Sequence, residues 1–207
     1  GIPKNEAEAL KLYQKAADKG LSVAQVDLGT FYHSGQLGVS KDDGEAMRWF
    51  QKAAAQGSGN GYHWLGMMYH NGWGVTKDYT EALKWYRKGD AISDADCRLM
   101  VASMYETGVG LPKDVVEAEK WWRKVGETGL DWAEYQVGYE FDDAHALPKN
   151  DQEALVWYRK AAAQGHTSAM LAVGRFYFEG RGVAKDASEG LDWYRRAADT
   201  NDPSALQ

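Results

Sequence analysis

Histidine and carboxylate side chains are the groups of this sequence that could bind a metal ion or carry out acid–base chemistry. His63 and His70 would share one face of a helix at i and i+7, but two turns separate them by roughly 10 Å along the axis, which is too far to ligate one ion. A site built from His33, His70 and a carboxylate would need unusual side-chain reach between stacked repeats. We therefore predict no metal ligand among these histidines.

Asp142, Asp143 and His145 form a closer cluster in a predicted loop, although acidic loops of this kind are usually just solvated. Hydrolytic catalysis would need a nucleophile, a base and an orienting group within hydrogen-bond reach, and no segment suggests such a set. The Gly72-Trp73-Gly74 and Gly180-Arg181-Gly182 segments have no strand before them and are not phosphate-binding loops. We expect no catalytic residue, no metal and no cofactor, so the chain is predicted not to be an enzyme.

Composition limits the partner as well. The 207 residues are 44% hydrophobic with only 4 prolines, enough to bury a core without disulfides or metal. A net charge of -6 works against nucleic acid and anionic lipid surfaces, and no apolar run reaches the length of a membrane span. We expect no nucleic-acid partner and no membrane insertion. The single cysteine, Cys97, cannot form an internal disulfide and leaves the redox compartment open.

A 36-residue period organises the chain. Its first row is Trp49, Trp85, Trp121, Trp157 and Trp193. The second row is Phe50, Tyr86, Trp122, Tyr158 and Tyr194, and the third is Gly29, Gly66, Ala102, Gly138 and Gly174. Leu12 and Tyr13 begin the first two rows, and one extra residue falls in a loop of the first full unit. The sequence therefore predicts tandem copies of one structural unit.

Each unit is predicted to contain two helices. The start of the second is marked by helix-capping residues at Asn5, Asp42, Asp78, Asp114, Asn150 and Asp186. A glutamate three residues later gives capping-box spacing, which accounts for these glutamates without catalysis. Ala46, Trp49, Phe50 and Ala53 then form one apolar face at i, i+3, i+4 and i+7. Helix-ending glycines are expected at Gly20, Gly57, Gly129 and Gly165 and at Gly35, Gly72, Gly108 and Gly180.

These residues carry a family resemblance. Leu65-Gly66-x-x-Tyr69-x-x-Gly72-x-Gly74-Val75-x-Lys77-Asp78-x-x-Glu81-Ala82-x-x-Trp85-Tyr86 resembles the Sel-one-like repeat, a relative of the tetratricopeptide repeat. The resemblance implies an all-α, right-handed superhelical solenoid of antiparallel helix pairs, with a concave face lined by the first helix of each pair. It covers the chain as one solenoid: a partial repeat at 1–22, repeats at 23–59, 60–94, 95–131, 132–167 and 168–202, and the start of another at 203–207.

Two units depart from the family pattern. The fourth replaces the Gly-x-Gly loop by Ala144-His145-Ala146-Leu147-Pro148, so that connection must adopt another turn. The second ends in Ser93 where glycine is usual, which puts its tight turn in doubt. Cys97 aligns with small residues and is expected to be a packing residue.

By resemblance, four positions of each first helix face the concave groove: one and four residues after the third-row glycine, and three and six before it. Rows that differ in every unit are free to encode a specific ligand, with a plain solvated surface as the alternative. The candidate partner-binding residues are Thr30, His33, His63, Met67, His70, Ser103, Glu106, Trp132, Tyr135, Tyr139, Asp142, Arg175 and Phe178. Trp132, Tyr135 and Tyr139 would form an aromatic patch beside Asp142, and aromatic, Met and Arg side chains commonly anchor interfaces.

The resemblance implies a scaffold or adaptor that binds a protein or peptide in its groove, and the acidic balance mildly favours a basic partner. The alternatives are a bacterial immunity protein that neutralises a secreted toxin, a small-ligand or cell-wall-fragment binder, and a hydrolase. The location is left open, between periplasm and cytoplasm if the source is bacterial.

Overall fold

Side-chain caps begin the second helix of each repeat, as the sequence predicts. Asp42 accepts a hydrogen bond from the Glu45 amide at 2.9 Å, and equivalent bonds reach Asp78, Asp114, Asn150 and Asp186. Each cap satisfies an amide that the first turn leaves unpaired. The prediction for Asn5 was wrong, because α1 (Ile2–Asp18) already begins at Ile2 and Asn5 lies inside it.

Only half of the predicted capping box forms. In a capping box the glutamate side chain would bond the cap residue's own N–H. Here that N–H already donates to a carbonyl of the preceding helix, as from Asp42 to Tyr32 at 2.8 Å. The glutamates turn outward instead, and Glu45 pairs with Arg48 at 2.7 Å. The backbone bond therefore joins the two helices of a pair.

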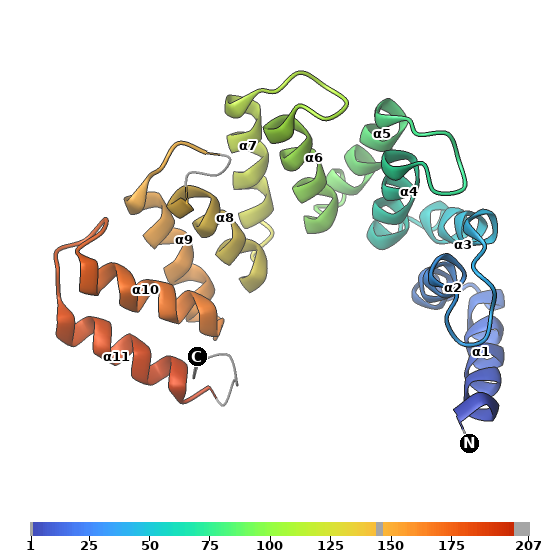
Figure 1. The fold of residues 1–207 in the computed structure, drawn as a ribbon, viewed down its shortest axis with the longest axis horizontal. Helices are drawn as coiled ribbons and strands as arrows, with labels where there is room; N and C mark the ends of the chain where they lie inside the picture. The colour runs from blue at the N-terminus through green and yellow to red at the C-terminus, as the bar shows by residue number, and fades with distance from the viewer. Residues whose placement is uncertain (1, 144–146, 201–207) are drawn as a thin grey trace. The chain divides into compact units, whose positions relative to one another are not determined.

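The computed structural model describes residues 2–143 and 147–200, in which the secondary structure is entirely α-helical (Figure 1). After α1, the described helices are α2 (Ser22–Ser34), α3 (Asp43–Ala55), α4 (Gly59–Asn71), α5 (Tyr79–Asp90), α6 (Ala95–Thr107), α7 (Val115–Gly126), α8 (Asp131–Asp143), α9 (Asp151–Ala163), α10 (Thr167–Glu179) and α11 (Ala187–Ala198). The expected all-α architecture of successive helix pairs is confirmed.

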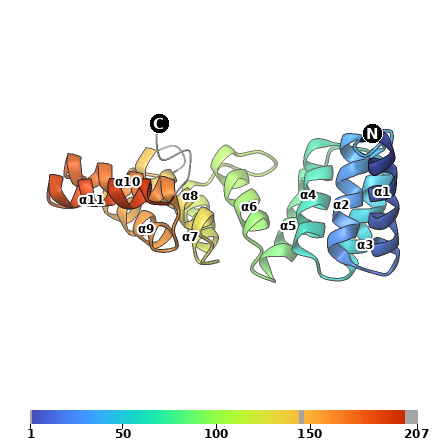
Figure 2. The same cartoon turned by 90° about the horizontal axis from the view of Figure 1, so that it is seen from below.

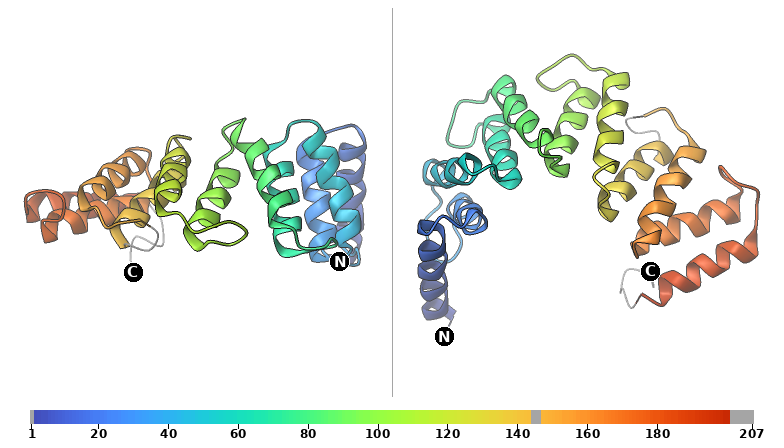
Figure 3. Two further views of the ribbon diagram at one scale, coloured as in Figure 1. Left: turned by 90° about the horizontal axis from the view of Figure 1, so that it is seen from above. Right: turned by 180° about the vertical axis from the view of Figure 1, so that it is seen from behind.

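Two compact units make up the chain: residues 1–104 with 108–112, and residues 105–107 with 113–207. In the first unit, α1 to α5 lie side by side (Figure 2). There α2 and α4 lie on one side, with α1, α3 and α5 on the other (Figure 3). In the second unit, α8 packs on α9, α9 on α10 and α10 on α11. First helices carry even numbers and second helices odd numbers.

A glycine of the first helix receives an aromatic ring of the second. A Cβ added at Gly29 would lie under 3.0 Å from the Phe50 ring, and the same holds for Gly66 with Tyr86. Gly138 faces Tyr158 and Gly174 faces Tyr194 equally closely. The rings of Phe50, Tyr86 and Tyr158 are buried. The third row therefore consists of small residues because a ring occupies the space of the side chain.

The tryptophan row joins one pair to the pair before it. Trp49 of α3 is buried with Ala17 of α1 and with Ala24 and Leu28 of α2. In the second unit, a Cβ on Gly126 of α7 would lie under 3.0 Å from the Trp157 ring of α9. The second-row ring therefore packs within a pair, and the first-row ring packs between pairs.

Residues in the left-handed backbone conformation end the helices at the positions where glycine was predicted. All eight predicted helix-ending glycines have positive φ, from 69° at Gly35 to 94° at Gly165. Ser93 also has a positive φ, of 61°, and its amide bonds the Asp90 carbonyl at 2.9 Å. The tight turn that the sequence put in doubt therefore forms, although a non-glycine residue is strained at positive φ. Of the irregular fourth loop, residues 144–146 lie outside the described residues, and Leu147 is buried.

The second glycine of each described Gly-x-Gly loop touches the first turn of the preceding second helix. A Cβ at Gly74 would lie 2.9 Å from the Asp43 Cβ, and one at Gly182 would come under 3.0 Å from the Asp151 carbonyl oxygen. Both glycines also have positive φ, at 67° and 65°. These loops therefore require glycine for conformation and for close approach.

We expect Gly182→Ala to destabilise the protein by about 3 kcal/mol, because the new methyl group adds a clash with backbone to the strain of positive φ. Gly165→Ala is the matched control. Its φ is 94°, but nothing lies within 4 Å of an added Cβ, so a loss of about 1 kcal/mol is expected. Urea unfolding followed by circular dichroism measures both. Equal losses would show that the loop contact does not constrain residue 182.

Candidate functional site

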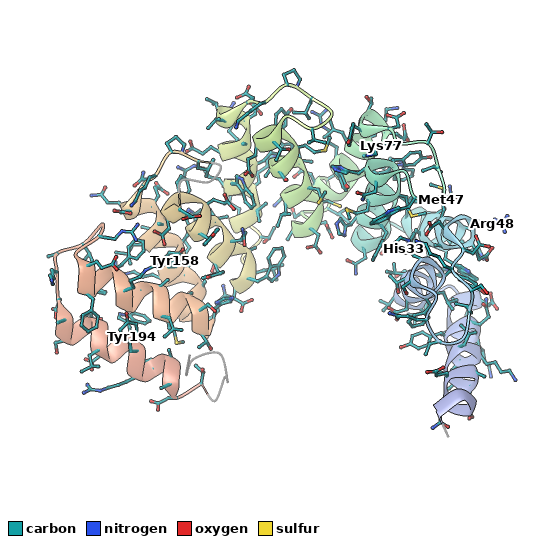
Figure 4. The ribbon with its side chains drawn as sticks, in the orientation of Figure 1. His33, Met47, Arg48, Lys77, Tyr158 and Tyr194 are labelled. Carbon is teal, nitrogen blue, oxygen red and sulfur yellow. The ribbon has the colours of Figure 1, made fainter. Side chains whose placement is uncertain are left out.

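Two of the candidate residues four positions after the third-row glycine, His33 and Asp142, contact a loop of the next repeat. His33 of α2 places Nδ1 2.6 Å from Oδ1 of Asp43, the first residue of α3. Its ring centroid lies 4.4 Å from that of Trp73, in the Gly72-x-Gly74 loop, and 5.7 Å from Trp64 of α4. Figure 4 labels His33 at this position. We call His33, Asp43 and Trp73 the upstream loop contact.

Asp142 makes the equivalent contact in the second unit with different chemistry. Its carboxylate is 9% exposed as a residue and accepts hydrogen bonds from Arg181, Arg175 and the Tyr158 hydroxyl, the last at 3.2 Å. Arg181 lies in the Gly180-x-Gly182 loop and also pairs with Asp151, the first residue of α9. Tyr158 is labelled in Figure 4. We call Asp142, Asp151 and Arg181 the downstream loop contact.

Electrostatics favour the charged forms in the downstream loop contact. The hydrogen bond from Arg181 lowers the pKa of Asp151 below its ordinary value of 3.8, although partial burial opposes the shift. The same pairing raises the pKa of Arg181. Because Arg181 bridges two carboxylates, Asp142 is held by its own neighbours and is not left open as an acceptor for a partner.

Both loop contacts use the same three positions of the repeat. Each joins the residue four after the glycine, the first residue of the following second helix, and the middle residue of the next Gly-x-Gly loop. Between them along the chain, His70 meets Tyr79 edge-on at 5.0 Å, again with the first residue of a second helix. Burial, more than the charge of Lys77, lowers the pKa of His70. At His33 and Asp142 of this row the residue type therefore has a packing explanation, because each contacts the middle residue of the next loop.

The last member of that row, Phe178, stacks on Tyr194 of α11 at 5.4 Å (Figure 4 labels Tyr194). Glu106 is half-buried at the same position of α6. These side chains are engaged within the protein.

Tyr139, one position after its glycine, is the candidate aromatic residue most open to solvent. It is 38% exposed, and its hydroxyl donates to Asp143 Oδ2 at 3.1 Å. That hydrogen bond, with the charge of Asp143, raises the pKa of Tyr139. Arg175, at the same position of α10, is a half-exposed side chain tied to Asp142.

Tyr135 and Trp132 precede Tyr139 on α8. Tyr135 stacks on His166 at 4.6 Å and tilts against Tyr158 at 5.5 Å, while Trp132 is half-buried. Arg175 of α10 pairs with Asp142, so its side chain lies against α8, the helix that carries these aromatic side chains. We call Trp132, Tyr135, Tyr139 and Arg175 the α8 patch.

The remaining candidates are half-buried. Thr30 bonds the Asp27 carbonyl of its own helix at 2.7 Å, and Met67 and Ser103 take its place in later repeats. The His63 ring lies 6.3 Å from that of Tyr86. Burial lowers the pKa of His63, and the charges of Asp96 and Asp94 oppose that shift. None of these residues offers as open an aromatic surface as the α8 patch.

Sequence reasoning missed Asp43, Trp73, Asp151 and Arg181, all of which complete the loop contacts. A signal was present. Trp73 and Arg181 occupy the same middle position of a Gly-x-Gly loop and are large where the loop needs no side chain. Trp73 lies against His33 and Arg181 against Asp142, so the loop residue and the residue it contacts differ together between the two repeats.

Within residues 2–143 and 147–200, no three His, Cys, Asp or Glu side chains gather as a metal site would require. Nor does that part of the chain contain a helix that is long and apolar enough to cross a membrane. His145 lies outside the described residues.

Comparisons with known proteins agree with the repeat architecture. The family model described as Sel1 repeat matches residues 1–21, 22–58, 60–89, 95–126, 133–166 and 167–202. A Sel1 repeat protein from Oxalobacter formigenes has a similar crystal structure, with 32% identity, a TM-score of 0.73, and coverage of 98% of this chain and 82% of that one. No curated protein sequence matches the chain significantly.

Two further solved structures share the fold. A protective antigen of uropathogenic Escherichia coli is 31% identical with a TM-score of 0.53, and the match covers 96% of this chain and 50% of that one. An immunity protein from Pseudomonas aeruginosa is 18% identical with a TM-score of 0.62, covering 94% and 74%. The chain thus spans only half of the antigen's length.

The downstream loop contact predicts a pH dependence. The folded-state pKa of Asp151 lies below its ordinary value, so its stabilising contribution is present above that value and is lost as the pH falls through the folded-state pKa. We expect Asp151→Asn to be less stable than the unaltered protein at neutral pH, with the difference shrinking toward about pH 2.5. Urea unfolding at both pH values measures this.

Asp192→Asn is the control, because Asp192 pairs with Arg195 at an exposed site and should contribute little at either pH. A stability difference for Asp151→Asn that is the same at both pH values would contradict the role given to its charge.

Proposed function

Because the chain belongs to the Sel1 repeat family, whose repeats are generally protein-interaction scaffolds, we propose that it binds a protein or peptide partner through the α8 patch. The observation that carries this proposal is the exposed Tyr139 on the same helix as Tyr135, with Arg175 held nearby through Asp142. Tyr, Trp and Arg are the residue types that most often dominate binding energy at protein interfaces.

The α8 patch is supported by contacts that hold it in place before any partner arrives. The Tyr139 hydroxyl is bound to Asp143, Arg175 is bound to Asp142, and Tyr135 is stacked on His166. Side chains that are already ordered lose less conformational entropy on binding than free ones. This favours recognition of a defined surface over non-specific adhesion.

Charge favours a basic partner. Helix α8 carries five carboxylates and no Lys or Arg. Glu134, Glu140 and Asp142 are buried, which leaves Asp131 and Asp143 as its carboxylates nearer the surface. Asp142 is neutralised by two arginines, whereas Asp143 is exposed at the end of the helix beside the Tyr139 hydroxyl. Complementary charge of this kind speeds association and helps to select partners.

Neutralisation of a toxin is not favoured by a specific observation. The similar structures described as immunity proteins are 18% and 21% identical to this chain, so the likeness concerns the fold alone. The α8 patch itself would serve a scaffold and an immunity protein equally.

We expect Tyr139→Ala to weaken binding about tenfold or more, because the ring is an open, pre-ordered contact. Tyr135→Ala should act in the same direction, with added loss of stability because Tyr135 packs on Tyr158. Isothermal titration with a partner recovered by pull-down and then purified measures the affinity.

Leu191→Ala is the matched control, since Leu191 is 44% exposed on α11 and its truncation should leave affinity unchanged. Unaltered binding by Tyr139→Ala would overturn the assignment of the α8 patch. Affinity that does not fall with added salt would overturn the basic partner.

A further inference from the structure

A polar clasp joins the end of a second helix to the first helix of its own pair at two places in the chain. Gln56, just after α3, donates to Gln25 of α2 at 2.7 Å. Gln164, just after α9, donates to Glu134 of α8 at 2.7 Å. The two clasps occupy equivalent positions of the repeat. In each clasp the glutamine after the second helix donates to a side chain near the start of the first helix of the same pair.

Two repeats lie between the clasped ones, and in the first of them the clasp is replaced by an aromatic and an apolar residue. Tyr62 of α4 stands at the position of Gln25, and Ile92, just after α5, stands at the position of Gln56. Instead of a hydrogen bond there is a hollow of about 450 Å³ between α3 and α5. The buried Ala54 and the half-buried Tyr62 and Trp85 line it. Ile92 is 51% exposed at its edge.

The walls of this hollow are ordered and apolar. Tyr62 and Trp85 stack with ring centroids 6.2 Å apart and planes at 28°. Small side chains at Ala54, Ala55 and Ala91 leave the space between the helices unfilled. Covering the aromatic rings and the exposed isoleucine would remove apolar surface from water, which is favourable for binding.

The edge of the hollow is positively charged. Lys88 lies among the lining residues, with Nζ 3.7 Å from the centroid of the Trp85 ring. Among the described residues Lys88 has no carboxylate within ion-pair distance, whereas Lys84 is paired with Glu81. Gln51 supplies a further hydrogen-bonding side chain at the edge. A carboxylate beside an apolar group would therefore complement this hollow.

We propose that the hollow between α3 and α5 is a second docking site, which receives an apolar side chain flanked by carboxylates from an acidic peptide segment of a partner protein. Tyr62, Trp85 and Ile92 cover the apolar side chain, and Lys88 meets the carboxylate. The site is separate from the α8 patch in both residues and charge, since the α8 patch favours a basic partner. The chain thus carries two docking surfaces of opposite preference.

Isoleucine labelling gives a direct test, because Ile2 and Ile92 are the only isoleucines of the sequence. Protein labelled at the isoleucine δ1 methyl groups is titrated with acetyl-Glu-Leu-Phe-Glu-amide and, separately, with acetyl-Lys-Leu-Phe-Lys-amide. The acidic peptide should shift the Ile92 methyl signal in a saturable way and leave Ile2 unchanged. The basic peptide, with the same apolar core, should give a much smaller shift.

Two variants sharpen the test. Lys88→Gln should weaken the acidic peptide about threefold, as expected for one charge at an exposed edge. The double variant Tyr62→Gln with Ile92→Gln rebuilds the clasp that Gln25 and Gln56 form, so it should fold and fail to bind a fluorescent form of the peptide. Thermal unfolding followed by circular dichroism verifies folding, and Tyr139→Ala should bind this peptide normally, which separates the site from the α8 patch.

The proposal is overturned if the acidic peptide leaves the Ile92 signal unmoved, if both peptides act equally, or if the folded double variant binds as before. It is also overturned if the Ile92 signal moves with protein concentration alone, because a second copy of the chain would then be the occupant.

Discussion

The contact between a second-helix aromatic ring and a first-helix glycine is the constraint on which the rest of the structure depends. The rings of Phe50, Tyr86 and Tyr158 lie so close to the opposing helix that even a methyl group at the facing glycine would overlap them. This contact fixes both the separation and the register of the two helices in a pair. It also fixes which side chains of the first helix point away from the second, and so which positions can meet a loop or a partner.

A second level of contacts joins one pair to the next. Tryptophans such as Trp49 and Trp157 pack back onto the preceding pair, and the Gly-x-Gly loop lies against the first turn of a second helix. The middle residue of that loop meets the side chain four positions after the glycine, as Trp73 meets His33 and Arg181 meets Asp142. Two different chemistries, a tilted contact between rings and a charged hydrogen bond, therefore serve one position. The α8 patch and the hollow beside Lys88 are two surfaces where repeats differ and side chains stay partly open to solvent.

The sequence predicts the fold well because its signals are local or strictly periodic. Caps such as Asp42 lie within three residues of the amide they bind, and the left-handed glycines end helices that begin nearby. Asn5 fails as a cap because α1 already begins at Ile2, three residues before it. The candidate site is harder to predict. Asp142 and Arg181 are 39 residues apart, and no pattern within one helix indicates that their side chains meet. Periodicity therefore selects a helix face, whereas exposure within that face depends on contacts between repeats.

At His33 and Asp142, the residue four positions after the glycine is matched to the loop of the next repeat. Exchange of the downstream pair for the upstream one, with Asp142→His and Arg181→Trp made singly and together, tests it most directly by urea unfolding. Asp151 remains in place to bond the new histidine, as Asp43 bonds His33. Each single variant should be destabilised and the double variant should regain stability, with a coupling of about 1 kcal/mol or more. Losses that simply add would contradict this matching.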